Sequence, residues 1–361
     1  MKTSELPRWA TGVVLPVLNL LSALLVAALV IHLLGEDPVE SMKILIDSAV
    51  VNPEGLGYTL FYASTFIFTG LAVSIAMKAG LFNIGAEGQM YLGGLGLTLA
   101  VLSFDSTLSP WLLIPLAMLG SAVFGALWAF LPGYLQAKRG SHVVVTTIMF
   151  NFIAANLMNF LIVKYLLPEG EQNPASRVFA DSAALPTLNA WLPFFGDSPL
   201  NIGFPIAIAA LVIYGVMVSR STWGYQLRAT GLNQHAAHYA GVRISRMIIY
   251  AMLISGALAG LASVNSIMGS THYLSLNFPA GAGFVGIAIA LMGRQHPVGI
   301  FLSSVLFGAL IQGGFDLSLE KPNIPVETFI FIQGLIILFC GAMENLYGPA
   351  LLKLINATRK G

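Results

Sequence analysis

The sequence predicts an all-α polytopic membrane protein with about ten transmembrane helices, and three observations support this prediction. Its 17 basic and 16 acidic residues amount to 9% of 361, against roughly 25% in a typical soluble domain. Hydrophobic residues make up 57% and the mean hydropathy is +0.81, more than a globular core buries. The apolar stretches are also about 20 residues long, the length that a helix needs to cross a bilayer.

Composition also bounds the organisation of the chain. A net charge of +1 gives no basic field for nucleic acid, and the single cysteine cannot form an internal disulfide. No polar block is long enough to fold alone, so we expect one transmembrane domain over residues 1–361. The longest polar stretch, residues 164–200, is rich in proline and is predicted to be a loop.

Ten apolar segments are the predicted spans. They are Gly12–Leu34, Thr59–Met77, Gly88–Phe104, Trp111–Leu131, Val143–Val163, Asn201–Val218, Met247–Met268, Phe284–Met292, Val298–Phe315 and Thr328–Met343. The first, residues 12–34, exceeds the 7–15-residue core of a secretory signal, so we interpret it as an uncleaved anchor. The eighth is short, and it either extends back into residues 277–283 or crosses only part of the membrane.

Charge distribution gives an independent test of this count, because Lys and Arg favour the cytoplasmic side. With the N-terminus inside, 13 of the 17 basic residues fall on cytoplasmic segments and 13 of the 16 acidic residues fall outside. One span more or fewer in the middle of the chain would scramble this division. The favoured topology therefore has ten spans with both ends inside.

The segment around residues 79–88 is predicted to be a broken helix. Glycines at 80, 85 and 88 interrupt an apolar run, and Asn83 is suited to cap a new helix. Glu87 stands out because ionisable residues within spans are costly and mark pathways. It either lines a substrate path at irregular backbone or offsets the helix dipole from the first turn.

The fifth span is unusually polar. Thr147 and Asn151 are spaced i,i+4 and share one face. That face either lines a cavity or makes hydrogen bonds between helices, and the second interpretation is favoured. The candidate substrate-path residues are Asn83, Glu87, Gln89, Thr147 and Asn151.

A basic loop, residues 219–246, carries four arginines and no acidic residue. Its centre, residues 231–241, is predicted to form a short helix between glycines, either simply solvated or docking a cytoplasmic partner. His235 and His238 lack a third ligand nearby, so they make a poor metal site. We expect no metal here.

Catalytic signatures are absent from the sequence. No lysine stands in a GxxxxGK[ST] phosphate-binding loop, and neither GxSxG nor HExxH occurs. We therefore expect a transport subunit rather than an enzyme. Any ATP must be hydrolysed by another chain.

Four stretches of the sequence are more specific than its composition: Met77–Gln89, Val144–Asn151, Arg228–Asn233 with Ala236–Gly241, and Ser255–Gly260. They resemble the permease subunits of bacterial ATP-binding-cassette importers of the nucleoside and simple-sugar type, in the superfamily of ribose and branched-chain amino acid permeases. The resemblance covers residues 58–346. The four stretches are specific to the family but do not name the substrate.

The resemblance implies a transport path for a nucleoside, purine or simple sugar in the bacterial inner membrane. It implies a cytoplasmic ATPase that holds ATP and Mg, a second related permease chain, and an extracytoplasmic binding protein that contacts residues 164–200. Residues 231–241 become the coupling helix. The residues expected to couple to the ATPase are Arg228, Gly231, Asn233, Ala236, Ala237, Tyr239 and Gly241.

Two alternatives remain open at this stage. The same fold imports branched-chain amino acids in some relatives. An ion-coupled secondary transporter needs no ATPase, but it should place several charged residues in mid-membrane, and only Glu87 is clearly placed there.

Overall fold

Helices account for most of residues 14–342, the part of the chain that the computed structural model describes. Between these residues no β-strand forms, and only two isolated bridges occur, one of which joins Ala175 to Ser275. The helices are α1 (Leu15–Leu33), α2 (Pro38–Ile46), η3 (Asp47–Val51), α3 (Pro53–Lys78), α4 (Ala86–Phe104), α5 (Pro110–Arg139), α6 (Val143–Leu161), η4 (Ile162–Leu166), η5 (Asp181–Ala183), η6 (Leu188–Ala190), η7 (Pro193–Phe195), α7 (Gly203–Arg220), α8 (Thr222–Leu232), α9 (Gln234–Tyr239), α10 (Ile244–Ser266), η8 (Ile267–Thr271), α11 (Ala282–Met292), α12 (Pro297–Glu320) and α13 (Glu327–Ala342). The all-α prediction is therefore confirmed.

Each of the ten predicted apolar segments coincides with a helix, although residues 12, 13 and 343 at the outer ends lie outside the described residues. Within residues 14–342, six helical segments are long and apolar enough to cross a membrane. They are Pro53–Lys78, Pro110–Arg139, Val143–Leu166, Gly203–Arg220, Ile244–Thr271 and Pro297–Glu320. The other predicted segments lie on α1, α4, α11 and α13, which do not meet both conditions over the described residues.

Local chemistry sets the helix boundaries. Proline opens α3, α5 and α12 at the first helical position, where its missing N–H costs nothing. Helix α5 ends at Gly140, which has φ +69° and takes the left-handed conformation that glycine tolerates best. Asn233 opens α9, because its side-chain oxygen accepts a hydrogen bond from the Ala236 N–H at 3.0 Å.

The chain divides into two compact units, one formed by Met1–Thr59 with Ala309–Gly361 and a larger one formed by Leu60–Gly308. In the smaller unit α1 packs against α13. Lys321 lies 2.8 Å from Glu40 and 3.4 Å from Glu36, which ties the α12–α13 connection to the start of α2. These contacts hold the smaller unit together at one end.

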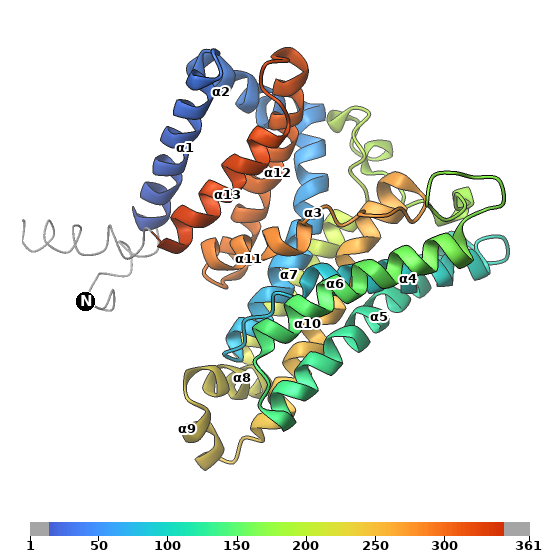
Figure 1. Cartoon of the computed structure of the whole chain (residues 1–361), viewed down its shortest axis with the longest axis vertical. Coiled ribbons are helices and arrows are strands. Elements are labelled where there is room, and N and C mark those ends of the chain that lie inside the picture. Colours follow the sequence, from blue (N-terminus) through green and yellow to red (C-terminus); the bar gives the residue numbers. More distant parts are fainter. Residues whose placement is uncertain (1–13, 343–361) are drawn as a thin grey trace, which may run out of the picture. The chain divides into compact units, whose positions relative to one another are not determined.

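The core of the larger unit is a bundle of α4, α5 and α10 (Figure 1). Glycines set its spacing. A Cβ on Gly260 of α10 would lie 2.3 Å from the Ser121 oxygen of α5, and one on Gly256 would lie 2.4 Å from the Gly125 oxygen. The GxxxG run on α10 therefore serves close helix packing.

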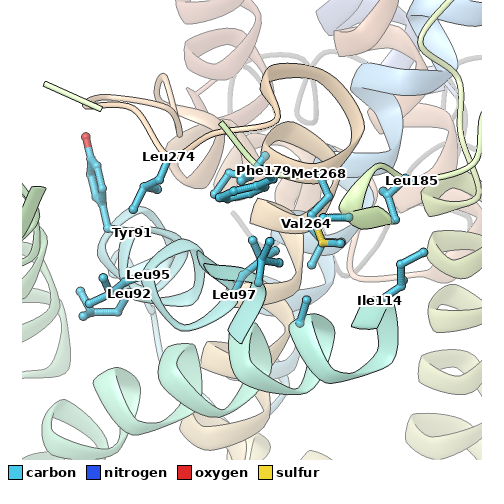
Figure 2. Packing of buried hydrophobic residues seen from close by; sticks show 14 of the residues in the cluster. Tyr91, Leu92, Leu95, Leu97, Ile114, Phe179, Leu185, Val264, Met268 and Leu274 are labelled. Carbon is cyan, nitrogen blue, oxygen red and sulfur yellow. The ribbon is translucent and has the colours of Figure 1, made fainter. Parts of the chain in front are cut away.

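A hydrophobic cluster covers the end of this bundle where α4 finishes and α5 begins (Figure 2). Leu97 of α4 and Ile114 of α5 contribute from the helices. Phe179 and Leu185 reach in from the long loop after η4. Burying these side chains contributes roughly 1.5–3 kcal/mol each, so the loop is fixed to the bundle.

Helix α11 decides between the two interpretations of the eighth segment. It extends back only to Ala282, because Asn277, Ala280 and Gly281 take positive φ values. Its 11 residues span about 16 Å, roughly half of a bilayer's hydrocarbon thickness. A partial span is the interpretation that the geometry supports.

The α5–α10 crossing generates a prediction. Gly260→Ala should lower the free energy of unfolding by about 1–3 kcal/mol, because the new methyl group meets the Ser121 carbonyl. The measurement is the unfolding midpoint of the detergent-solubilised protein in fluorescence-detected size exclusion. Gly334→Ala is the matched control, since nothing lies within 4 Å of the position that its new methyl group would take. Equal midpoints for the two variants would contradict the packing role.

Candidate functional site

A non-helical segment, residues 79–85, separates α3 from α4 and is largely buried. Buried backbone polar groups need partners, and side chains from neighbouring helices supply them. Asn151 of α6 accepts from the Gly88 N–H at 2.9 Å and donates to the Ile84 oxygen at 2.9 Å. Thr147, one turn earlier, accepts from the Ile84 N–H at 3.3 Å. The Thr147–Asn151 face therefore binds the break.

Asn83 lies at the centre of this network. Its Oδ1 accepts from the Gly85 N–H at 2.9 Å, and its Nδ2 donates to Gln89 Oε1 at 3.0 Å and to Ser255 Oγ at 2.8 Å. Ser255 in turn donates to the Ala72 oxygen at 2.6 Å. The expected capping role changes as a result, because Gly85 rather than Asn83 occupies the N-cap position of α4.

Glu87 joins two helix starts. It lies in the first turn of α4, and its carboxylate reaches across to the start of α11. Oε1 accepts from the Gly281 N–H at 2.9 Å and Oε2 from the Gly283 N–H at 2.8 Å. A Cβ on Gly283 would lie 2.3 Å from the Glu87 nitrogen, so the two helix N-termini touch. One negative charge thus offsets the positive ends of two helix dipoles.

Basic residues gather at one end of the larger unit, which we call the basic end. Here α3, α5 and α7 finish and α10 begins. Two contacts join these termini: Gly231 of α8 touches the Lys78 oxygen, and Ser245 donates to the Ala137 oxygen at 3.2 Å. The basic residues on the helix ends and connections here are Lys78, Lys138, Arg139, Arg220, Arg228, Arg243, Arg246 and Arg294.

The expected coupling residues lie at this end, on α8, α9 and the turn that follows. Tyr239 is 92% exposed and Leu232 is 88% exposed, so α9 and the end of α8 present a free surface. Ala237 is buried, and a Cβ on Gly231 would lie 2.3 Å from the Lys78 oxygen. The other four residues have different environments. Arg228 is partly buried and Asn233 caps α9, whereas Ala236 is exposed and Gly241 takes φ +83°.

The opposite end of the larger unit holds the long loop. Arg177 forms two hydrogen bonds to Asp105 at the end of α4, at 2.7 and 2.9 Å. The Arg177 guanidinium holds the pKa of the Asp105 carboxyl below its usual value. Ser176 also donates its backbone N–H to the Leu274 oxygen at 2.9 Å. The loop is therefore fastened at several points.

Residues 55–341 match the family described as the permease component of the branched-chain amino acid transport system. The match covers well over half of the chain. The chain belongs to this permease family.

Three relatives show what similar permeases carry. The chain is 37% identical over 286 residues to the guanosine ABC transporter permease protein NupP of Bacillus subtilis, covering 79% of the chain and 80% of the relative. It is 34% identical over 334 residues to the nucleoside ABC transporter permease protein NupB of Lactococcus lactis, covering 91% and 90%. It is also 34% identical over 328 residues to the glucose ABC transporter permease protein TsgB13 of Haloferax volcanii, covering 90% and 86%.

In this permease the five candidate path residues come together around one break. Four of them bind backbone groups with their polar atoms, Gln89 bonds to the Asn83 side chain, and the path role stays a prediction. The sequence reasoning missed Ser255 and the N–H groups of Gly281 and Gly283. Ser255 opens one of the runs that carry the family resemblance, which was a signal for it.

A second buried polar cluster gave no such signal. Asn265 of α10 donates to the Phe61 oxygen at 2.9 Å and to Thr65 Oγ1 at 3.0 Å. It accepts from Asn201 Nδ2 at 3.1 Å. Asn201 lies 64 positions and Thr65 lies 200 positions from Asn265 in the sequence, so no local pattern could have paired them.

Asn151 provides the first test of the break. Asn151→Ala should lower the free energy of unfolding by about 1–3 kcal/mol, because the Gly88 N–H and the Ile84 carbonyl lose a buried partner. Thermal unfolding of the solubilised permease measures it. Asn156→Ala on the same helix should stay within about 0.5 kcal/mol, since its side chain is exposed. Equal losses would remove the special role of Asn151.

Glu87 provides the second test of the break. Glu87→Gln turns one acceptor oxygen into an NH₂ group facing an N–H, so the unfolding midpoint should fall by the equivalent of about 1–3 kcal/mol. Glu54→Gln, at an exposed position in the first turn of α3, is the control. A Glu87→Gln permease that keeps its midpoint but loses transport would instead assign Glu87 to the substrate path.

Proposed function

We propose that this permease forms part of the translocation path of an ATP-driven importer, and that its substrate is a nucleoside, a purine or a simple sugar. The observation that carries this proposal is membership of a transport permease family, with relatives at 34–37% identity named for guanosine, nucleosides and glucose. Two of those three names specify nucleosides. A nucleoside is accordingly the first substrate to test.

The exposed surface of α9 supports coupling to a separate ATPase. Residues 219–246 contain no acidic residue, and Tyr239 and Leu232 project from them with little burial. Tyrosine, tryptophan and arginine side chains contribute most to binding when a partner covers them, and Tyr239 is such a residue. The coupling residues would thus meet an ATPase that holds the ATP and Mg, while this chain binds no cofactor and catalyses no reaction.

The proposed topology has ten crossings with both ends in the cytoplasm. It is supported by the basic end, where α3, α5 and α7 finish, and by the loop that carries Arg177 at the opposite end. Positive residues favour the cytoplasmic side, so the basic end would face the cytoplasm. The loop would then meet an extracytoplasmic binding protein at the outer face of a bacterial inner membrane.

A translocation path must also be lined on its other side. We expect a second, related permease chain to supply it, with lipid around the pair. The family's own description keeps branched-chain amino acids as the second candidate substrate.

Uptake into proteoliposomes tests the proposal. The permease is tagged and purified with the ATPase and permease chains that accompany it, then assayed with labelled guanosine, glucose and leucine. The expected result is guanosine uptake that requires ATP on the side of the membrane where the ATPase lies. Substrate movement driven by an ion gradient through this chain alone would overturn the importer assignment.

Tyr239 tests the docking surface. Tyr239→Ala should weaken ATPase binding by about tenfold or more, because a large aromatic anchor is removed from an exposed helix. Binding is measured by co-purification of the ATPase, with the unfolding midpoint as a check on folding. Tyr225→Ala, exposed on α8 rather than α9, is the matched control. Equal ATPase binding by both variants would exclude α9 as the docking element.

Gly231 and Ala237 are less suited to this test. A bulky residue at Gly231 would collide with the Lys78 carbonyl, and Ala237 is buried. Substitutions there would disturb the fold before they reach the docking surface.

A further inference from the structure

A cavity of about 960 Å³ opens at the basic end of the larger unit, and no residue of the break at 79–85 lines it. It lies between α7 and the start of α12, and the ends of α3 and α8 close it at one side. Its volume is at the upper end of the roughly 300–1,000 Å³ that small-molecule sites occupy. None of the substrate-path candidates lines it.

One side of the cavity is basic. Its charged lining is Lys78, Arg220 and Arg228, with His296 beside them, and no acidic residue lines it. Among the described residues none of these three cations forms an ion pair with a carboxylate. Nη1 of Arg228 is buried and has no hydrogen-bond partner there. A buried guanidinium nitrogen without a partner is costly, so the cavity is built to receive an anion.

The rest of the cavity is apolar. Leu211, Val212 and Val216 of α7 line it, and Val298 and Phe301 of α12 face them. Val212 is 61% exposed and Val298 is 59% exposed. A lining of this kind extends for more than a turn along two helices of membrane-spanning length, which suits hydrocarbon rather than a small polar solute.

We propose that this cavity binds an anionic phospholipid, with the phosphate against Lys78, Arg220 and Arg228 and an acyl chain along α7. The charged headgroup matches the basic side of the lining, and the acyl chain matches the apolar side that follows it along α7 and α12. The inference rests on the proposed membrane placement, in which this end lies at the cytoplasmic leaflet, where anionic lipids attract basic residues.

Native mass spectrometry of the full permease complex in detergent tests the site. The probes are phosphatidylglycerol, phosphatidylcholine with the same chains, and sn-glycerol 3-phosphate as the free phosphate. Phosphatidylglycerol should be retained, whereas phosphatidylcholine and the free phosphate should not. Equal retention of the two lipids, or binding of the free phosphate in place of the lipid, would overturn the proposal.

Two kinds of variant locate the binding. Arg220→Gln and Arg228→Gln should each weaken retention of phosphatidylglycerol by roughly fivefold. Arg243→Gln and Arg246→Gln, which are exposed at the same end but do not line the cavity, should leave it unchanged. Val216→Trp should also reduce retention by filling the apolar part while keeping every charge. The proposal fails if the lining and control variants retain equal lipid, or if the cavity proves to be occupied by a second protein chain.

The readout separates this proposal from the importer assignment. Lipid retention in detergent needs neither ATP nor transport. Lipid binding without ATP-dependent uptake would therefore support the lipid site and contradict the importer assignment. ATP-dependent uptake by a complex that retains no phosphatidylglycerol would do the reverse.

Discussion

The carboxylate of Glu87 holds together the two helix starts on which the centre of the larger unit depends. The first residues of helix α11, Ala282 and Gly283, are buried, so the N–H groups at its start need partners within the protein. The bonds from Gly281 and Gly283 to one carboxylate satisfy those groups. Because Glu87 is itself in the first turn of α4, the same charge also stabilises the start of that helix.

This arrangement connects the interior with the basic end. Helix α11 begins at Ala282, next to Glu87, and finishes at Met292, about 16 Å further on, beside the turn whose Gln295 lines the cavity. On the other side of the break, Gly231 lies against Lys78 and Gly80. Helix α8 is therefore packed backbone to backbone against the chain that leads into Asn83 and its hydrogen-bond network.

Much of this could be predicted from the sequence, and the reasons are physical. Apolar length and charge distribution are one-dimensional signals, so the helix positions and the basic loop could be identified directly. The Thr147–Asn151 face was visible because helical spacing is local. The partners of that face were not, since Gly88 lies 63 positions from Asn151 and its N–H carries no sequence signature. Glu87 was identified as unusual, but its partners on α11 could not be.

The two ends of the larger unit differ in whether their basic residues are paired with carboxylates, and this difference bears on which partners each end would bind. At the loop end Arg177 is neutralised within the chain by Asp105, whose pKa it lowers, and the loop is bonded to the bundle. At the basic end the cations of the cavity have no carboxylate among the described residues, and Arg228 keeps a buried nitrogen without a partner. A buried guanidinium nitrogen without a partner in the chain can bind a group from outside it. Anionic lipid and an ATPase surface are the two groups that this end would meet.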